Sequence, residues 1–485
     1  MKLLITLVAI CFAAGSVNAM VPGDLIKVVP GQSIQDAIDV ADPGDTIEVK
    51  KGVYIERLYV DVPRLTLKGK GAIIDAEYEG PCISVNADDV SILGFRLVNG
   101  TAGVLAGDFG FGPQDVKFEP ADDLVLIKNT AIACMPLGGL LVYGNDAVIE
   151  GNTVLGAGGL GIGYQSDSPE SRSYLTKNVV KFTRYYELCI GFGDVDCFPG
   201  GNGIQASGGR LDIVGNRSEH NDLTGIKVWI LDDVFEKKQD NKFHARVVGN
   251  VATNNGAELD ICFGSDGPPP IPEEYIVGED GIFVFDPAGM GTLVEKNVTN
   301  DNGHDGIKVV GWDFVVRGNK ASYNLDDGIH MSTYNSVLDK NVASYNRDDG
   351  LRGDGGFLFA ADVSPPGVRI TNNSSFGNAD EGIDFAGSNH YIGKNKASSN
   401  LQNGIRVYNG QYVVIEHNQA DKNGHQGISN SCWMADILFN KAKGNACGIG
   451  PDIAGAGDLG GTVDQWAGNQ YGTGGKLVED RCREP

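Results

Sequence analysis

The stretch GNKASYNLDDGIHM at residues 318–331 is followed 22 residues later by KNVASYNRDDGLRG at residues 340–353, and this repetition decides the fold. Related segments begin at Gly151, Gly215, Lys296, Asn372, Lys394 and His417. Their shared asparagine falls at positions 297, 319, 341, 373, 395, 418 and 440, in steps of 22, 22, 32, 22, 23 and 22 residues. Upstream, the series continues at Asn129, Asn152, Asn178, Asn216 and Asn250. Self-similarity at a nearly fixed period indicates a solenoid.

A unit of about 22 residues is too short for TPR, ankyrin or WD40 repeats. It suits one coil of a parallel β-helix, in which short strands of alternating polarity are joined by turns rich in Asn and Gly. A leucine-rich repeat has a similar length, but its L-x-x-L-x-L pattern is absent. We therefore predict an all-β, right-handed parallel β-helix, and we interpret the recurrent Asn and Gly residues as structural.

The segment before the first repeats predicts a cap. Residues 33–41, SIQDAIDVA, form a short amphipathic pattern typical of a helix, and PGDTIEVKKGVYIERLYV follows at residues 43–60. This order resembles the N-terminal cap of right-handed parallel β-helix proteins of the pectate-lyase-like superfamily, which carry repeats of the PbH1 type. A cap is needed because an end coil would otherwise expose its apolar core and unpaired strand edges.

The first 19 residues have the features of a signal peptide. Lys2 precedes the apolar run 3–14, and Val17-Asn18-Ala19 resembles a cleavage site. A membrane anchor is the alternative, but the run is short for a span of about 20 residues. We expect a secreted, monomeric protein, extracellular or periplasmic if bacterial, with the β-helix over residues 20–455 and a capping tail over 456–485.

The charge balance excludes two classes of partner. The chain of 485 residues has 39 basic and 63 acidic residues, a net charge of −24. Such a chain lacks the basic surface expected of a nucleic-acid-binding protein, and it would be repelled by an anionic membrane. A polyanionic sugar would be repelled as well unless a cation intervened. Hydrophobic residues make up 41% of the chain, which is enough for a packed core.

Eight cysteines remain after the signal segment, and an even number in an exported protein favours disulfide bonds. The pairs closest in sequence are Cys189 with Cys197 and Cys432 with Cys447. The other pairings stay open.

Two rows of side chains are expected on one face of the solenoid. In a strand, the residue after each buried aliphatic residue of the Gly-Ile motif faces outward. Coil by coil, this outward row contains Gln205, Lys227, Asp260, Phe283, Lys308, His330, Arg352, Asp384, Arg406 and Ser429. The position before the Gly gives a second row of Asp280, Asp305, Asp327, Asp349, Glu381 and Asn403, flanked by Asp326, Asp348 and Asp380. Basic side chains would thus lie beside carboxylates.

Stacked carboxylates about 4.8 Å apart repel each other by roughly 3 kcal/mol at an effective dielectric constant of about 20. Neighbouring Lys and Arg, raised pKa values or a bound cation would relieve this repulsion, and carboxylate oxygens suit Ca²⁺. The alternative is that Asp-Gly serves only as turn chemistry, balanced by nearby basic residues. Our predicted metal ligands are Asp327, Asp349, Asp380, Glu381 and Asp384.

The segment Asp380-Glu381-Gly382-Ile383-Asp384 resembles the D-D-G-x-D calcium loop of one family of β-helical pectate lyases, with Glu381 in place of the second Asp. In that family a lysine further along the chain is the base. Here Arg406 occupies the outward position one coil on. The resemblance implies Ca²⁺ and an acidic, uronate-containing polysaccharide.

The sequence thus predicts a calcium-assisted lyase that acts by β-elimination, with Lys308, His330, Arg352 and Arg406 as catalytic residues. His330 has the most suitable ordinary pKa for taking the C5 proton. A non-catalytic carbohydrate-binding or cell-surface protein is the main alternative, and a uronate C5-epimerase is the second. Trp229, Trp312 and Trp433 are either sugar platforms or packing residues. Insertions are expected at residues 163–174, 189–203, 231–243, 262–278 and 352–367.

Overall fold

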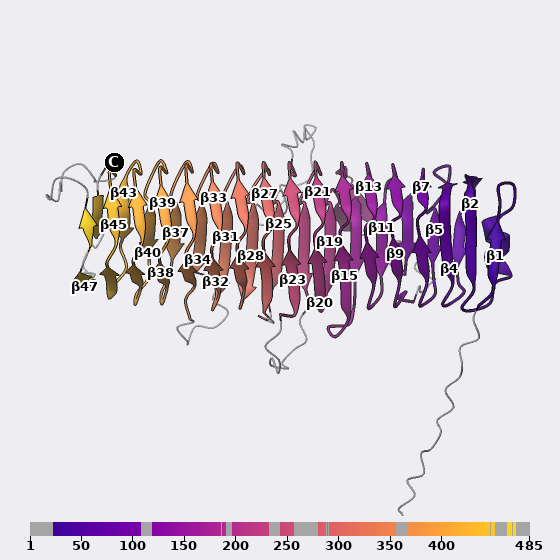
Figure 1. Ribbon diagram of the computed structural model, residues 1–485, viewed down its shortest axis with the longest axis horizontal. Helices are drawn as coiled ribbons and strands as arrows, with labels where there is room; N and C mark the ends of the chain where they lie inside the picture. The colour runs from indigo at the N-terminus through magenta and orange to yellow at the C-terminus, as the bar shows by residue number, and fades with distance from the viewer. Residues whose placement is uncertain are drawn as a thin grey trace, which may run out of the picture.

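Parallel strands wind into one long solenoid that extends from the N-terminal to the C-terminal coils (Figure 1). The computed structural model describes residues 23–107, 119–185, 187–190, 196–231, 243–256, 280–287, 289, 291–355, 366–446, 448–451, 463–467 and 469–471. The predicted signal peptide, residues 1–19, lies outside them, as does most of the predicted tail 456–485. The fold prediction of a right-handed parallel β-helix is confirmed.

A typical coil contributes one strand to a 15-stranded sheet and two strands to a 31-stranded sheet. In one such coil, β28 (Ile307–Trp312) belongs to the first sheet, and β29 (Val315–Arg317) and β30 (Lys320–Ser322) belong to the second. The 15-stranded sheet contains β3 (Leu58–Val60), β5 (Ile83–Val85), β8 (Ala102–Ala106), β11 (Gly138–Tyr143), β14 (Leu160–Gln165), β19 (Ile204–Gly208), β22 (Ile226–Ile230), β25 (Ile282–Asp286), β28, β31 (Ile329–Tyr334), β34 (Leu351–Gly355), β37 (Ile383–Ala386), β40 (Ile405–Tyr408), β43 (Gln426–Asn430) and β46 (Gly448–Pro451).

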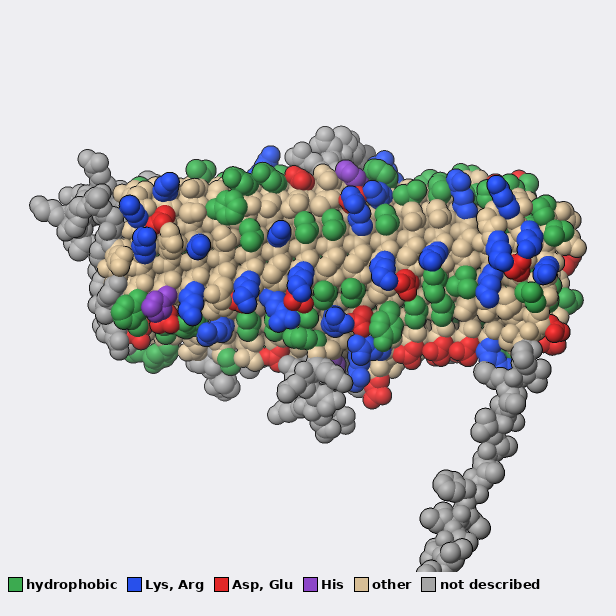
Figure 2. Space-filling model, in the orientation of Figure 1, with side chains coloured by type: hydrophobic (Ala, Val, Ile, Leu, Met, Phe, Trp, Pro, Cys, Tyr) green, Lys and Arg blue, Asp and Glu red, His purple; other side chains and the backbone are tan. Residues whose placement is uncertain are grey.

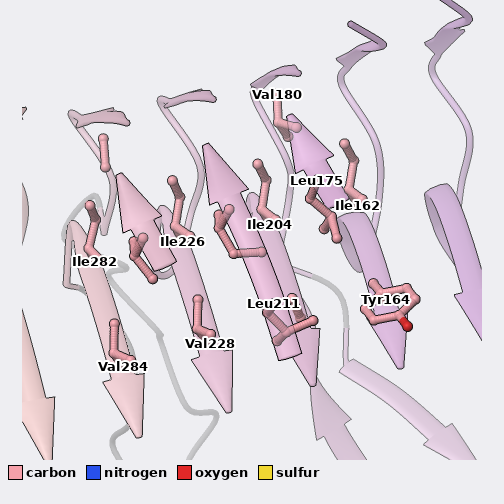
Figure 3. Close-up of a cluster of buried hydrophobic side chains, with 14 of the residues drawn as sticks. Ile162, Tyr164, Leu175, Val180, Ile204, Leu211, Ile226, Val228, Ile282 and Val284 are labelled. Atoms are coloured by element: carbon pink, nitrogen blue, oxygen red, sulfur yellow. The ribbon is translucent and has the colours of Figure 1, made fainter. Parts of the chain in front are cut away.

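The core is a stack of aliphatic rows. Ile162, Ile204, Ile226 and Ile282 pair in register on successive strands and are fully buried (Figure 3). Burying one such side chain contributes about 1.5–3 kcal/mol. Because inward and outward positions alternate along a strand, this register also fixes which side chains stack on the outside.

The recurrent asparagines form a buried ladder, in agreement with their interpretation as structural residues. The Asn319 amide donates to Asn341 Oδ1 at 3.0 Å and to the Val294 carbonyl at 2.9 Å, and the backbone N–H of Asn319 donates to Asn341 Oδ1 at 2.9 Å. The same ladder runs from Asn129 to Asn469. A second ladder, which the sequence did not reveal, runs from Asn221 to Asn445.

At the N-terminal end, the predicted helix is the single turn-and-a-half α1 (Ile34–Asp39). Ser33 caps it by accepting from the Asp36 N–H, while Glu56 accepts from the Ile34 N–H and the Ser33 hydroxyl, each at 2.9 Å. Ile34 and Ile38 are fully buried in the core. That this short helix covers the end of the solenoid stays a prediction.

Two strands continue the solenoid inside the predicted tail. β47 (Val463–Ala467) and β48 (Gln470–Tyr471) pair in parallel with β44 (Ala435–Leu438) and β45 (Lys441–Lys443). The predicted insertion at 163–174 is wrong at both ends, because residues 163–165 belong to β14 and residues 172–174 to β15 (Arg172–Thr176). Large parts of the other four insertions lie outside the described residues.

The cysteine prediction is wrong in part. Cys82, Cys134 and Cys432 are buried free thiols. Cys447, the nearest cysteine to Cys432 in the sequence, lies outside the described residues. Cys189 and Cys197 are opposite each other in the antiparallel hairpin of β17 (Glu187–Ile190) and β18 (Asp196–Pro199). Their side chains lie outside the described residues.

Candidate functional site

The outward row predicted from the sequence is present on the 15-stranded sheet. Register pairs join Lys308 to His330, His330 to Arg352, Arg352 to Asp384, and Asp384 to Arg406. We call these five residues the central row. At about 4.8 Å per strand, it extends for about 19 Å along the solenoid axis.

One predicted member of the outward row, Asp260, is not among the residues that pair in this sheet. Lys227 pairs directly with Phe283, because β22 is followed in this sheet by β25. No described strand lies between them. Asp260 itself lies outside the described residues.

The second predicted row, which we call the turn row, is also present and consists of Asp280, Asp305, Asp327, Asp349, Glu381 and Asn403. Each Asp uses Oδ1 to accept the N–H of the next member: Asp305 accepts from Asp327 at 3.1 Å and Asp327 from Asp349 at 2.9 Å. Hydrogen bonding within the turns thus accounts for the position of one oxygen of each Asp carboxylate. In Asp305 and Asp327 the second oxygen faces charged neighbours, and all six residues of the row are buried.

A third row, the flanking row, consists of His304, Asp326, Asp348, Asp380 and Gln402 on successive coils. His304 neutralises the first carboxylates. Its Nδ1 is 2.9 Å from Asp280 Oδ1 and its Nε2 is 3.0 Å from Asp326 Oδ2. Hydrogen bonds with Asp280 and Asp305 raise the pKa of His304 to about 11. The sequence analysis missed His304, although it takes the place of the first Asp of the Asp-Asp-Gly repeat.

His330 lies between two carboxylates. Its Nδ1 is 3.2 Å from Asp305 Oδ2, its Nε2 is 2.9 Å from Asp354 Oδ2, and only 9% of the residue is exposed. Burial lowers the pKa of His330, but the hydrogen bonds with Asp305 and Asp354 outweigh burial and raise it to about 9. His330 is therefore protonated at neutral pH, which does not suit the free base that its ordinary pKa suggested.

Asp354 is a second residue that the sequence analysis missed. It stands two positions after Arg352 in β34, so the two side chains point to the same face. Its side chain is 41% exposed, and the hydrogen bond from His330 lowers its pKa. Arg352 Nε is 3.5 Å from Asp354 Oδ1. Asp354 is thus an ionised carboxylate that reaches the surface with a buried imidazolium behind it.

The other basic residues of the central row also contact carboxylates. Lys308 Nζ is 3.5 Å from Asp305 Oδ2, and burial, which lowers the pKa of Lys308, is outweighed by Asp305 and Asp280. In the same way, neighbouring carboxylates outweigh burial and raise the pKa of Arg352. Both side chains are cations, suited to binding an anion and not to taking a proton.

The predicted metal ligands separate into two groups. Asp349 and Asp380, together with Asp348, offer carboxylate oxygens within 4.8 Å of one another, and Asp327 forms a similar group with Asp326 and Asp348. By contrast, Glu381 and Asp384 contact Arg406, at 3.5 Å from Glu381 Oε1 and 4.0 Å from Asp384 Oδ1. Neither Glu381 nor Asp384 joins a ligand group among the described residues.

The carboxylates in the middle of these rows have too few cationic neighbours to keep them all ionised. Burial and the neighbouring Asp327 and Asp384 raise the pKa of Asp349 to about 10, and burial followed by Asp305 raises that of Asp327 to about 8. Asp327 Oδ2 is fully buried yet accepts no hydrogen bond in the described part of the chain. The donor set of Asp348, Asp349 and Asp380 therefore fits a hard divalent cation.

The three tryptophans differ in their surroundings. Trp229 is 47% exposed and meets Phe285 edge to face, with ring centroids 6.3 Å apart. Trp312 packs against Tyr334 in the next coil. Trp433 lines a small hollow together with Ser388, Asn409, Gly410, Gln411 and Ser431. Trp229 stands two positions after Lys227 in β22, so it projects from the same sheet face as the outward row.

Charged side chains are also distributed unevenly over the surface of the solenoid. On the face seen in Figure 2, Lys and Arg are spread over the whole length, and Asp and Glu gather along the lower edge near the N-terminal coils. Within the described residues, no helix is long and apolar enough to cross a membrane.

Comparison with known proteins agrees with this architecture. The model of the family described as "Right handed beta helix region" matches residues 275–390 and 313–452. Over this part, which is less than half of the chain, the sequence is similar to that family. The sequence finds no match among curated proteins.

Several solved structures resemble the chain at low sequence identity. The periplasmic alginate epimerase AlgG is 11% identical, over 92% of this chain and 82% of that chain, with a TM-score of 0.36. The A-module of the Azotobacter vinelandii mannuronan C-5 epimerase AlgE6 is 14% identical, over 85% and 83%, with a TM-score of 0.30. Pectate lyase Pel9A is 12% identical, over 71% and 83%, with a TM-score of 0.38.

Proposed function

We propose that the protein binds an acidic, uronate-containing polysaccharide along the central row and cleaves it by β-elimination. One observation carries this proposal: Lys308, His330, Arg352 and Arg406 lie in a single row of a parallel sheet, each beside a carboxylate. The four cations are spaced along the solenoid axis and can pair with the carboxylates of a linear polyanion once a bound divalent cation offsets the acidic residues beside them.

The ionised Asp354 and the cations around it supply the chemistry. In a β-elimination the C5–H and C4–O bonds break, a C4=C5 double bond forms, and the leaving oxygen gains a proton. Asp354 takes the C5 proton and delivers it to the leaving oxygen, while the imidazolium of His330, 2.9 Å away, holds the carboxylate in place. Lys308 and Arg352 bind the substrate carboxylate and stabilise the enolate that develops.

A divalent cation such as Ca²⁺ belongs to this proposal. Asp348, Asp349 and Asp380 would hold it, in agreement with their clustered oxygens. When bound, it supplies positive charge that neutralises these carboxylates and attracts the anionic polymer. Arg406 contacts Glu381 and Asp384 and extends the positive row beyond the ion-binding cluster.

The test is ultraviolet absorbance from unsaturated uronates, with pectate, alginate and glycosaminoglycans as substrates. We expect absorbance to rise on at least one polymer, to fall with EDTA, and to disappear in Arg352→Met. The matched control, Arg317→Met on the 31-stranded sheet, should keep its activity. An absence of signal on all three polymers would contradict cleavage. Solvent deuterium entering C5 without unsaturated product would identify an epimerase instead, and binding alone would identify a carbohydrate-binding protein.

A further inference from the structure

Lys227 continues the outward row toward the N-terminal coils but lacks the partner that the other basic residues have. It pairs in register with Phe283, and Phe283 pairs with Lys308. No ion pair joins Lys227 to a carboxylate within the part of the chain that the structure describes. The cation is therefore two strands away from Lys308 and stands apart from the ion pairs of the central row.

The turn preceding each strand explains this difference. Asp305 stands three residues before Lys308 and contacts it at 3.5 Å. The same position before Lys227 holds Thr224, whose buried hydroxyl has no hydrogen-bond partner in the described ranges. Asp280 on the next coil acts on Lys227 at longer range, but its Oδ1 already contacts His304 Nδ1 at 2.9 Å. Among the described residues, the positive charge on Lys227 is thus left without a direct counter-ion.

Aromatic rings take the place of the missing carboxylate. Lys227 Nζ is 5.2 Å from the centroid of the Trp229 ring and 6.0 Å from that of Phe283. Cation–π attraction of this kind contributes about 0.5–2 kcal/mol and leaves the N–H groups free to donate. Burial lowers the pKa of Lys227, and Asp280 acts in the opposite direction.

We propose that Lys227 and Trp229 form a second uronate subsite, in which the sugar ring stacks on Trp229 and its carboxylate pairs with Lys227. This inference rests on the proposed function, because the ligand is a further residue of the same polymer. Lys227 lies three strands from His330, a distance of about 14 Å. The polysaccharide therefore runs from the central row toward the N-terminal coils.

The test measures the affinity of size-defined oligogalacturonates and oligomannuronates by titration calorimetry, together with tryptophan fluorescence. For wild type, affinity should increase once the oligomer is long enough to reach from the His330 strand to Lys227. Lys227→Met should remove most of that increase. We expect a loss of about tenfold in affinity, the size typical of one lost charged hydrogen bond. The affinity of the shortest oligomers should be unchanged. Trp229→Ala should abolish the fluorescence change. Lys320→Met, on the 31-stranded sheet, is the matched control.

Carboxyl-reduced oligomers of equal length test the charge. Their binding should respond to Trp229→Ala but not to Lys227→Met. The subsite is overturned, with the proposed function intact, if Lys227→Met binds long acidic oligomers as wild type does. If affinity depends on Lys227 and on oligomer length but no unsaturated product forms, the result supports the subsite and contradicts the proposed cleavage. If wild type binds no acidic oligomer, both proposals fall.

Discussion

The imidazole Nε2 of His330 lies 2.9 Å from the carboxylate Oδ2 of Asp354, although 24 residues separate the two along the chain. The register between β31 and β34 brings them together, and Asp305 holds the other ring nitrogen at 3.2 Å. The buried imidazolium of His330 thus links the buried carboxylate of Asp305 to the exposed carboxylate of Asp354.

Replacing Asp354, the exposed carboxylate of this pair, should stop catalysis without unfolding the protein. Asp354→Asn keeps the size of the side chain and a hydrogen-bond acceptor for His330 but cannot take a proton. We expect the rate of unsaturated uronate formation to fall about 10²–10⁴-fold, the usual contribution of a general base or acid. Asp301→Asn, at an exposed turn with φ of 55°, is the control. Activity of Asp354→Asn within threefold of wild type would remove Asp354 from the mechanism.

Asp349 should determine the response of stability to calcium. Burial among like charges raises its pKa to about 10, so Asp349→Asn should increase the free energy of unfolding in EDTA by about 1 kcal/mol or more, because one pKa unit corresponds to about 1.4 kcal/mol. Calcium at about 100 times its Kd should stabilise wild type by about 2.7 kcal/mol and this variant much less. Thermal unfolding with and without calcium checks both effects. Equal calcium shifts in the two proteins would contradict the assignment.

The asparagine ladder should be a main source of stability. In Asn319→Ala, the Asn297 N–H and the Val294 carbonyl lose their partners inside the solenoid. A buried unpaired group costs about 1–3 kcal/mol, so the two together should lower the free energy of unfolding by at least about 2 kcal/mol. Denaturant unfolding, with Asn300→Ala on the outward face of β27 (Val298–Asn300) as control, measures this loss. A change as small as that of the control would show that the ladder contributes little.

His390 should make stability depend on pH. Burial lowers its pKa, and the neutral ring accepts from the Val368 N–H and donates to the Ala386 carbonyl, each at 3.0 Å. Below the unfolded pKa of about 6.5 the unfolded chain binds a proton that the folded chain excludes. The stability contributed by His390 is therefore complete above pH 6.5 and is lost as pH falls toward the folded pKa, by up to about 1.4 kcal/mol per pH unit.

The variant His390→Gln isolates this effect. Its stability deficit relative to wild type should be largest near pH 7.5 and should shrink toward pH 5, as measured by denaturant unfolding at each pH. A deficit that stays constant over this range would show that His390 does not titrate between the folded and unfolded states.

The repeat predicted the stacking of Lys308, His330 and Arg352, because a fixed period and a strand's two-residue alternation together determine which side chains become neighbours. It could not predict that β22 pairs directly with β25, because the longer step between Asn250 and Asn297 does not reveal whether the extra residues add a coil or a loop. The sequence also could not predict that Glu381 and Asp384 pair with Arg406, because this pairing depends on the direction of the side chains.

The protonation of His330 also lay beyond the sequence. Its ordinary pKa suggested a base, but the shift depends on Asp305 and Asp354, and Asp354 lies in β34 although the sequence placed it in a predicted insertion. The free thiol of Cys432 shows a similar limit, because an even number of cysteines says nothing about which sulfur atoms meet.

The central claim is that the outward face of the 15-stranded sheet holds an acidic polymer. A crystal structure of Asp354→Asn with calcium and a hexauronate tests it most directly. We predict sugar density along the side chains from Lys308 to Arg406 and an ion among Asp348, Asp349 and Asp380. Sugar bound on the 31-stranded sheet, with this row left bare, would contradict the account.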